Sequence, residues 1–162
     1  MRAGLATIVL AAALASAGCG GGGGGADARP KEPPGHFVQT FVGELYRGET
    51  GKAWDLLHPI QQAKVPRAKY VACEREAPLQ GTAQRIDVIR VVDVQAEIPG
   101  GAGKVPSTAV TFRVLLALPG YSKPQPITHT AHVFNVHGRW AWVIGPNDFP
   151  AYAAGICPAE AS

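Results

Sequence analysis

Histidine is the side chain in this sequence best suited to bind a metal, and the spacing of the histidines does not favour a site. The five are His36, His58, His129, His132 and His137. His129 and His132 lie three positions apart, so a β-strand would turn them to opposite faces. The chain contains neither a Cys-x-x-Cys nor a His-x-x-x-His pair. No phosphate-binding loop or dinucleotide fingerprint is present either, and we therefore expect no metal site and no cofactor.

Acid–base catalysis would need a buried carboxylate or histidine beside a second ionisable group. Asp87, Asp93 and Glu97 alternate with apolar residues, so we expect them to face solvent. A histidine–tyrosine pair without a carboxylate is insufficient for such chemistry, and we assign no catalytic residue. The residues that we expect to line a pocket are Tyr46, Trp54, Tyr70, Arg90 and His132.

The N-terminus has the pattern of an export signal. Arg2 precedes an apolar run over 5–17, which is shorter than the roughly 20 residues of a membrane-spanning helix. The sequence Ala-Ser-Ala-Gly that leads to Cys19 resembles a bacterial lipobox, except that Ser16 stands where the pattern usually has Leu. We expect 1–18 to be a lipoprotein signal peptide and Cys19 to carry lipid on the extracytoplasmic face of the cell membrane. The alternative is ordinary cleavage after Ala17, which would yield a secreted protein.

The segment that follows Cys19 predicts a tether. Six consecutive glycines occupy 20–25, and prolines recur at 30, 33 and 34. We expect 19–34 to be disordered, 35–158 to form one domain and 159–162 to be a tail. The net charge of the whole chain is only +3, which gives no support to nucleic-acid binding.

The number of cysteines is consistent with an exported protein. If Cys19 carries lipid, Cys73 and Cys157 remain, which is the even number expected of a secreted domain. A disulfide between them would stabilise the fold by roughly 4 kcal/mol in the chain-entropy model. The alternative is two free buried thiols.

The hydrophobic pattern changes from helical to alternating along the domain. Helical spacing covers 36–46, and shorter helices are predicted over 50–57, after Pro59 and over 66–75. Alternation predicts strands over 86–98, 108–118, 128–136 and 139–144, with a tight turn at His137-Gly138. Helices followed by an antiparallel meander of about four strands indicate an α+β fold.

Arg90 shares the parity of the apolar residues in the first predicted strand. Two interpretations are open. Arg90 lines a pocket and meets an anionic ligand, or a β-bulge near 89–91 turns it outward. Bulges are common in curved sheets, which favours the second interpretation.

Three segments resemble actinobacterial lipoproteins with a nuclear transport factor two-like domain. They are AWDLLHP at 53–59 followed by Gln61, YVAC at 70–73, and VHGRWAWV at 136–143. The resemblance covers roughly 36–158. It implies a cystatin-like roll, in which a curved antiparallel sheet encloses a cone-shaped pocket beside the helices. The superfamily includes isomerases, dehydratases and binding modules, so the resemblance indicates fold more than function.

These observations predict a non-catalytic, membrane-tethered binding domain. Its partner would be a small hydrophobic ligand or an envelope protein. An alternative is an isomerase- or dehydratase-like enzyme on the same roll, which a buried ionisable pair in the pocket would favour. A further alternative is an accessory domain in cell-wall assembly, which a pocket filled by side chains would favour.

The lipid on Cys19 is directly testable. Intact-mass measurement of the mature protein should show a diacylated or triacylated N-terminal cysteine. An unmodified N-terminus at Gly18, produced by cleavage after Ala17, would contradict the prediction.

Overall fold

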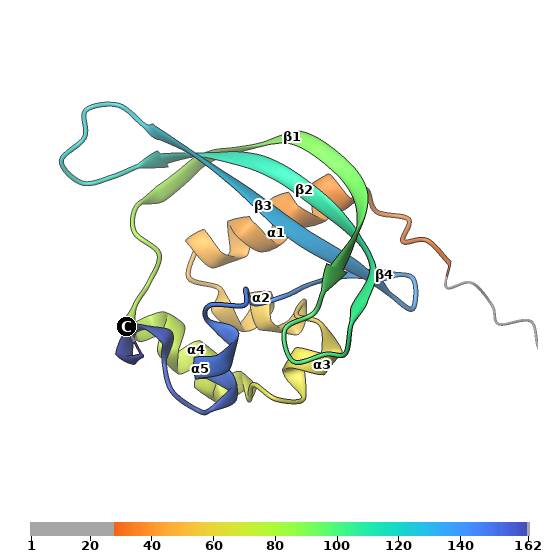
Figure 1. Ribbon diagram of the computed structural model, residues 1–162. Coiled ribbons are helices and arrows are strands. Elements are labelled where there is room, and N and C mark those ends of the chain that lie inside the picture. Colours follow the sequence, from red (N-terminus) through yellow and green to blue (C-terminus); the bar gives the residue numbers. More distant parts are fainter. Residues whose placement is uncertain (1–27, 162) are drawn as a thin grey trace, which may run out of the picture.

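Helices occupy the first half of the chain and strands the second in the computed structural model, which describes residues 28–161 (Figure 1). The helices are α1 (Pro34–Tyr46), α2 (Thr50–Asp55), α3 (Pro59–Gln62) and α4 (Arg67–Glu76). The strands are β1 (Thr82–Glu97), β2 (Lys104–Ala117), β3 (Gln125–Val136) and β4 (Arg139–Trp142). The tail adds a short helix, α5 (Phe149–Ala153), and a 3-10 turn (Pro158–Glu160). The sheet order β1-β2-β3-β4, antiparallel throughout, confirms the predicted α+β meander.

The helix boundaries follow from proline and glycine. Pro34 is the first residue of α1, two positions before the predicted start, and Gly48 follows its end with a φ of 71°. Pro59 opens α3 as expected. His58 caps α3, because its Nδ1 accepts the N–H of Ile60 at 3.2 Å. In the described residues no helix is long and apolar enough to cross a membrane.

A bulge in β1 changes which side chains face the helices. Val88 pairs with Phe112 and Arg90 with Thr111, so Ile89 is left between two ladder partners. Residues of the same parity before and after the bulge therefore lie on opposite faces of the sheet. The predicted bulge is confirmed, but it separates the apolar residues of β1 that alternation had placed on one face.

The hairpin between β3 and β4 has the predicted two-residue turn. His137 has a φ of 50° and Gly138 a φ of 80°, as a type I′ turn requires at both positions. Asn135 Oδ1 accepts the N–H of Gly138 at 2.9 Å. The turn fixes the register that places Trp142 opposite Val133.

The end of the predicted tether packs on the domain. Trp140 Nε1 donates to the carbonyl of Glu32 at 2.7 Å, and Arg29 lies 3.3 Å from the carboxylate of Asp93. These contacts place 28–33 against the domain, within the range 19–34 for which the sequence predicts a tether. The signal peptide, Cys19 and the glycine run lie outside the described residues.

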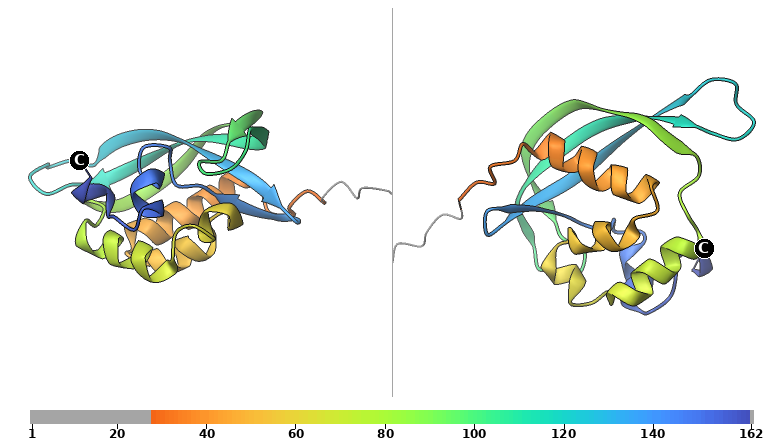
Figure 2. Two further views of the ribbon diagram at one scale, coloured as in Figure 1. Left: turned by 60° about the horizontal axis from the view of Figure 1, so that its bottom comes forward. Right: turned by 180° about the vertical axis from the view of Figure 1, so that it is seen from behind.

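The main core lies between α1 and the curved sheet (Figures 1 and 2). The rings of Phe41 and Trp142 stack with centroids 5.2 Å apart, and Phe37 packs beside Phe41 at 5.6 Å. From the sheet, Val110, Phe112, Val114 and Leu116 are buried against them. Large side chains therefore fill the space between α1 and the sheet.

Gln61 is a completely buried polar residue that connects three separate segments. Its Nε2 donates to the carbonyl of Pro99 at 3.2 Å and to that of Ile144 at 3.1 Å. Its Oε1 accepts the N–H of Ile144 at 2.7 Å. One amide thus satisfies the backbone of the β1–β2 connection and of the segment that follows β4.

Replacing Gln61 should destabilise the fold strongly. Gln61→Leu keeps the size but leaves buried backbone groups unpaired, so we expect the free energy of unfolding to fall by about 3 kcal/mol. Urea denaturation measures the difference. Gln80→Leu, at an exposed position, should change the value by less than about 0.5 kcal/mol. Equal stability of Gln61→Leu and the wild type would contradict this role.

Candidate functional site

A cavity of about 330 Å³ lies between α4, the end of α1, the segment after β4 and the C-terminal tail; we call it the α4–α5 cavity. Its apolar wall includes Leu45, Tyr70, Trp142, Ile144 and Tyr152. Four acidic side chains line the same space: Glu74, Glu76, Asp148 and Glu160. Aromatic surface and carboxyl groups therefore meet in one hollow.

Helix α4 contributes one face to this cavity. Tyr70, Cys73 and Glu74 are three and four positions apart, so they share a face of the helix. Tyr70 is only 2% exposed, and its ring lies 6.4 Å from the ring of Trp142 and 5.3 Å from that of Tyr152. The three rings form a cluster around the cavity wall.

Backbone and side-chain hydrogen bonds fix Trp142 in that wall. Its Nε1 donates to the carbonyl of Ala53 at 2.7 Å. Its backbone N–H and carbonyl bond to Leu56 and His58 at 3.1 and 2.8 Å. The indole is therefore already satisfied by hydrogen bonds and offers only its apolar ring to the cavity.

A disulfide between Cys73 and Cys157 attaches the tail to α4. The two Cα atoms lie 5.2 Å apart, across 84 positions of sequence. This is the pairing that the cysteine count predicts. In the chain-entropy model a loop of this length gives about 4 to 5 kcal/mol. The bond holds the tail, and with it Tyr152, against α4.

Glu74 and Tyr152 form an ionisable pair at the cavity. The hydroxyl of Tyr152 donates to Glu74 Oε1. Burial raises the pKa of Glu74, the Tyr152 hydrogen bond opposes the rise, and the charge of Asp148 adds to it. Burial and the neighbouring Glu74 also raise the pKa of Tyr152. The carboxyl group is thus held in a setting that favours its neutral form.

The hydroxyl group of Tyr70 makes no hydrogen bond with another described residue, although the side chain is only 2% exposed. The one fully enclosed side-chain oxygen or nitrogen without a partner in the described chain is Glu44 Oε2, so the Tyr70 oxygen keeps some contact with the open space of the cavity. Buried tyrosine hydroxyls usually find a partner. Because Tyr70 lines the α4–α5 cavity, a molecule in the cavity could supply the missing partner.

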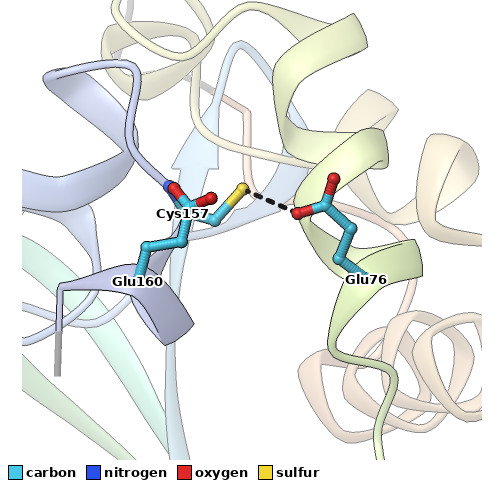
Figure 3. A group of neighbouring side chains, drawn as sticks. All are labelled: Glu76, Cys157 and Glu160. Carbon is cyan, nitrogen blue, oxygen red and sulfur yellow. Dashed lines mark hydrogen bonds between the residues drawn. The ribbon is translucent and has the colours of Figure 1, made fainter.

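Glu76, Cys157 and Glu160 all line the cavity. Figure 3 shows these three side chains as neighbours. Their ligand-type atoms lie within 4.8 Å of one another. The sulfur of Cys157 is bonded to Cys73, so it has neither a thiolate for a metal nor a proton to donate. Its 3.6 Å approach to Glu76 is therefore a packing contact. Glu160 Oε2 already accepts the N–H of Cys157 at 3.2 Å.

The structure does not bring the five predicted pocket residues together. Tyr70 lines the α4–α5 cavity, whereas Tyr46 borders a separate hollow of about 210 Å³ beside β1. Trp54 donates its indole N–H to the carbonyl of Val65 at 2.9 Å. His132 lies on the outer face of β3, 3.4 Å from the hydroxyl of Ser107. Arg90 is exposed next to the bulge, as the second interpretation of this residue predicts.

Glu74 is not among the residues that the sequence predicts to line a pocket. The signal was present, because Glu74 follows Tyr70 by four positions and Cys73 by one. A disulfide at Cys73 requires this face of α4 to turn inward. The contribution of Tyr152 and Asp148 depended on the path of the tail, which no periodicity in the sequence indicates.

A larger hollow, of about 430 Å³, lies on the sheet beside Arg29. Its charged groups are already paired, since Asp93 accepts from the hydroxyl of Thr108 at 2.8 Å and lies 3.3 Å from Arg29. Its two charged side chains are thus paired with each other, whereas the acidic groups of the α4–α5 cavity have no basic partner in the described chain, and that cavity is the better candidate site.

The raised pKa of Glu74 predicts that this residue costs stability at neutral pH. The pKa of the Glu74 carboxyl group is higher in the folded protein than its ordinary value of 4.5. Below pH 4.5 the group is neutral in the folded and the unfolded states alike and costs no stability. As the pH rises through the folded-state pKa, the unfolded state ionises more readily and the protein loses stability. Glu74→Gln should therefore unfold at higher urea than the wild type near pH 7. The advantage should disappear as the pH falls below 4.5. Glu97→Gln, at an exposed position, is the matched control. A constant difference across this pH range would contradict the prediction.

Comparisons with known proteins leave the site to be interpreted from its own geometry. No protein-family model matches the chain, and neither a curated protein nor a solved structure does so.

Proposed function

We propose that this protein is an exported lipoprotein whose folded domain binds a small hydrophobic ligand in the α4–α5 cavity. The export signal and the lipid on Cys19 are supported by the apolar run over 5–17 and the residues that lead to the cysteine. The disulfide between Cys73 and Cys157 is consistent with an oxidising compartment outside the cytoplasm. The domain would act on the extracytoplasmic face of the membrane, without a catalytic step.

We assign the fold to the cystatin-like rolls. A curved sheet of four antiparallel strands with a long helix across one face supports this assignment (Figure 2). In such a roll the usual pocket lies between the helix and the sheet. Here Phe41, Phe112 and their neighbours occupy that space, so the ligand would bind at the end of the roll instead.

The observation that carries the proposal is the combination of an apolar cavity with an unpaired polar group. A volume of about 330 Å³ is at the lower end of ligand pockets, which range from about 300 to 1,000 Å³. Such pockets have mostly apolar walls and a few polar groups that orient the ligand. Leu45, Trp142 and Ile144 supply the wall, and the Tyr70 hydroxyl is available for orientation.

An enzyme is the second candidate, because the half-buried Glu74 and the buried Tyr152 form an ionisable pair of the kind that an isomerase or dehydratase would need. A carboxyl group with a raised pKa beside a tyrosine hydroxyl can accept and return a proton. Mass spectrometry of the bound ligand before and after long incubation separates the two functions. A ligand recovered unchanged supports binding alone, and a chemically converted one supports the enzyme.

A protein partner, as an accessory domain in cell-wall assembly would need, is favoured by exposed apolar residues on β1. Ile89 is 53% exposed, and Val88 and Val91 beside it are also exposed. β1 is an edge strand of the sheet, so one side of its backbone has no strand neighbour among the described residues, although Gln39 donates to the carbonyl of Ile86. These residues lie away from the α4–α5 cavity, so a partner there would not compete with the ligand.

Blocking the cavity tests the proposed function. Gly145 lines it, and a Cβ placed there would meet no atom within 4 Å. Gly145→Trp should therefore fill the opening and weaken binding of the neutral probe N-phenyl-1-naphthylamine, followed by fluorescence, at least about tenfold.

The matched control is Ala154→Trp, which adds the same side chain at an exposed position outside the cavity. It should bind the probe as the wild type does. Chemical-shift changes in the wild type should cluster at Leu79, Tyr152 and their cavity neighbours. Equal binding by both variants, or shifts elsewhere, would count against the cavity as the site.

A further inference from the structure

We infer that the α4–α5 cavity selects a positively charged amphiphile, namely an apolar body with an amine or quaternary ammonium head. This inference rests on the proposed function and specifies the class of ligand. It is carried by the charges around the cavity, by its aromatic wall and by the unpaired hydroxyl of Tyr70.

The charge of the cavity is opposite to that of the whole chain. The protein has a net charge of +3, yet four carboxyl groups line this one hollow. Among the described residues that line it, none is lysine, arginine or histidine. An anionic amphiphile would therefore meet only like charges, which disfavours it.

The cavity carboxylates also differ from most other acidic groups of the described chain in that none of them pairs with a basic side chain. Elsewhere in the described chain, six acidic side chains pair with a basic one: Glu32, Glu44, Glu49, Asp55, Asp87 and Asp93. Within residues 28–161, no ion pair is made by Glu74, Glu76, Asp148 or Glu160. Outside the cavity, Glu97 is the one described acidic side chain that also makes no ion pair. The unpaired negative charge of the domain is thus concentrated where a ligand would bind.

Aromatic rings and carboxylates together are the groups that recognise organic cations. The faces of tryptophan and tyrosine attract ammonium groups, most strongly where water is excluded. Tyr70, Trp142 and Tyr152 form such a cluster, and Glu74 lies beside Tyr152. The oxygen of Tyr70 can accept an ammonium N–H, which would give this buried hydroxyl its missing partner.

Three compounds of one size test the charge preference: 4-phenylbutylamine, 4-phenylbutan-1-ol and 4-phenylbutanoate. Calorimetry at low salt, on the full chain with Cys19→Ser so that no lipid interferes, gives the three affinities. We expect the amine to bind at least about tenfold more tightly than the alcohol, and the acid more weakly than either. Added salt should weaken binding of the amine alone.

Substitutions test whether the preference for a positively charged ligand arises from the cavity carboxylates. Glu74→Gln and Asp148→Asn should each weaken the amine several-fold and leave the alcohol unchanged. Glu97→Gln removes an unpaired carboxylate outside the cavity and should change neither. Tyr70→Phe should also weaken the amine, since it removes the accepting oxygen.

The pH dependence gives a separate readout. Glu74 is faced by Tyr70 on its own helix, by Tyr152 from α5 and by Asp148 before α5, and none of these is cationic. Amine binding should therefore strengthen as the pH rises and Glu74 ionises, and Glu74→Gln should remove this dependence.

The two proposals fail in different ways. If the alcohol binds as tightly as the amine, or if only N-phenyl-1-naphthylamine binds, the cationic ligand class is wrong and the cavity remains a ligand site. If Gly145→Trp affects neither the probe nor the amine, the proposed function itself is wrong. Loss of amine binding in Glu97→Gln would also overturn the inference, because the charge effect would then not be specific to the cavity.

Discussion

The buried amide of Gln61 is the interaction on which the arrangement of this domain depends. It joins α3 to the carbonyl of Pro99, where the β1–β2 connection curls toward the helices, and to both backbone groups of Ile144. A buried amide with its partners satisfied specifies one geometry, because every alternative leaves polar groups unpaired. Ile144 belongs to the wall of the α4–α5 cavity. The same amide that closes the sheet on the helices therefore also fixes one side of the candidate site.

The opposite side of the cavity depends on a covalent bond. The tail has little apolar surface of its own, and Phe149 and Tyr152 are its main buried side chains. The disulfide to Cys73 holds this segment on α4, and Tyr152 is thereby brought to Glu74. The site is thus assembled from a helix in the first half of the domain and a tail at its end. A rigid amide on one side and a disulfide on the other keep the cavity open between them.

The buried Glu74 shows a conflict between stability and recognition. Its carboxyl group is partly removed from water and has no cationic partner in the described chain, so its ionised form is unfavourable in the folded protein. Six other acidic side chains of the described chain instead pair with lysine, arginine or histidine. A carboxylate that is left unpaired against aromatic rings retains its capacity to interact with a ligand. Proteins tolerate such local costs at functional sites.

Four features could be predicted from the sequence alone: the order of elements, the bulge near Ile89, the His137-Gly138 turn and, as the favoured alternative, the disulfide between Cys73 and Cys157. Each of these depends on local rules: periodicity, proline and glycine geometry, and the parity of cysteines. The folded structure was needed to choose between the two open interpretations of Arg90, and to show that Gln61 is the buried link and that Glu74 faces a cavity. Those outcomes depend on contacts between segments far apart in the chain, such as Gln61 with Ile144 and Glu74 with Tyr152. Local patterns do not contain the path of the tail, and that path creates the site.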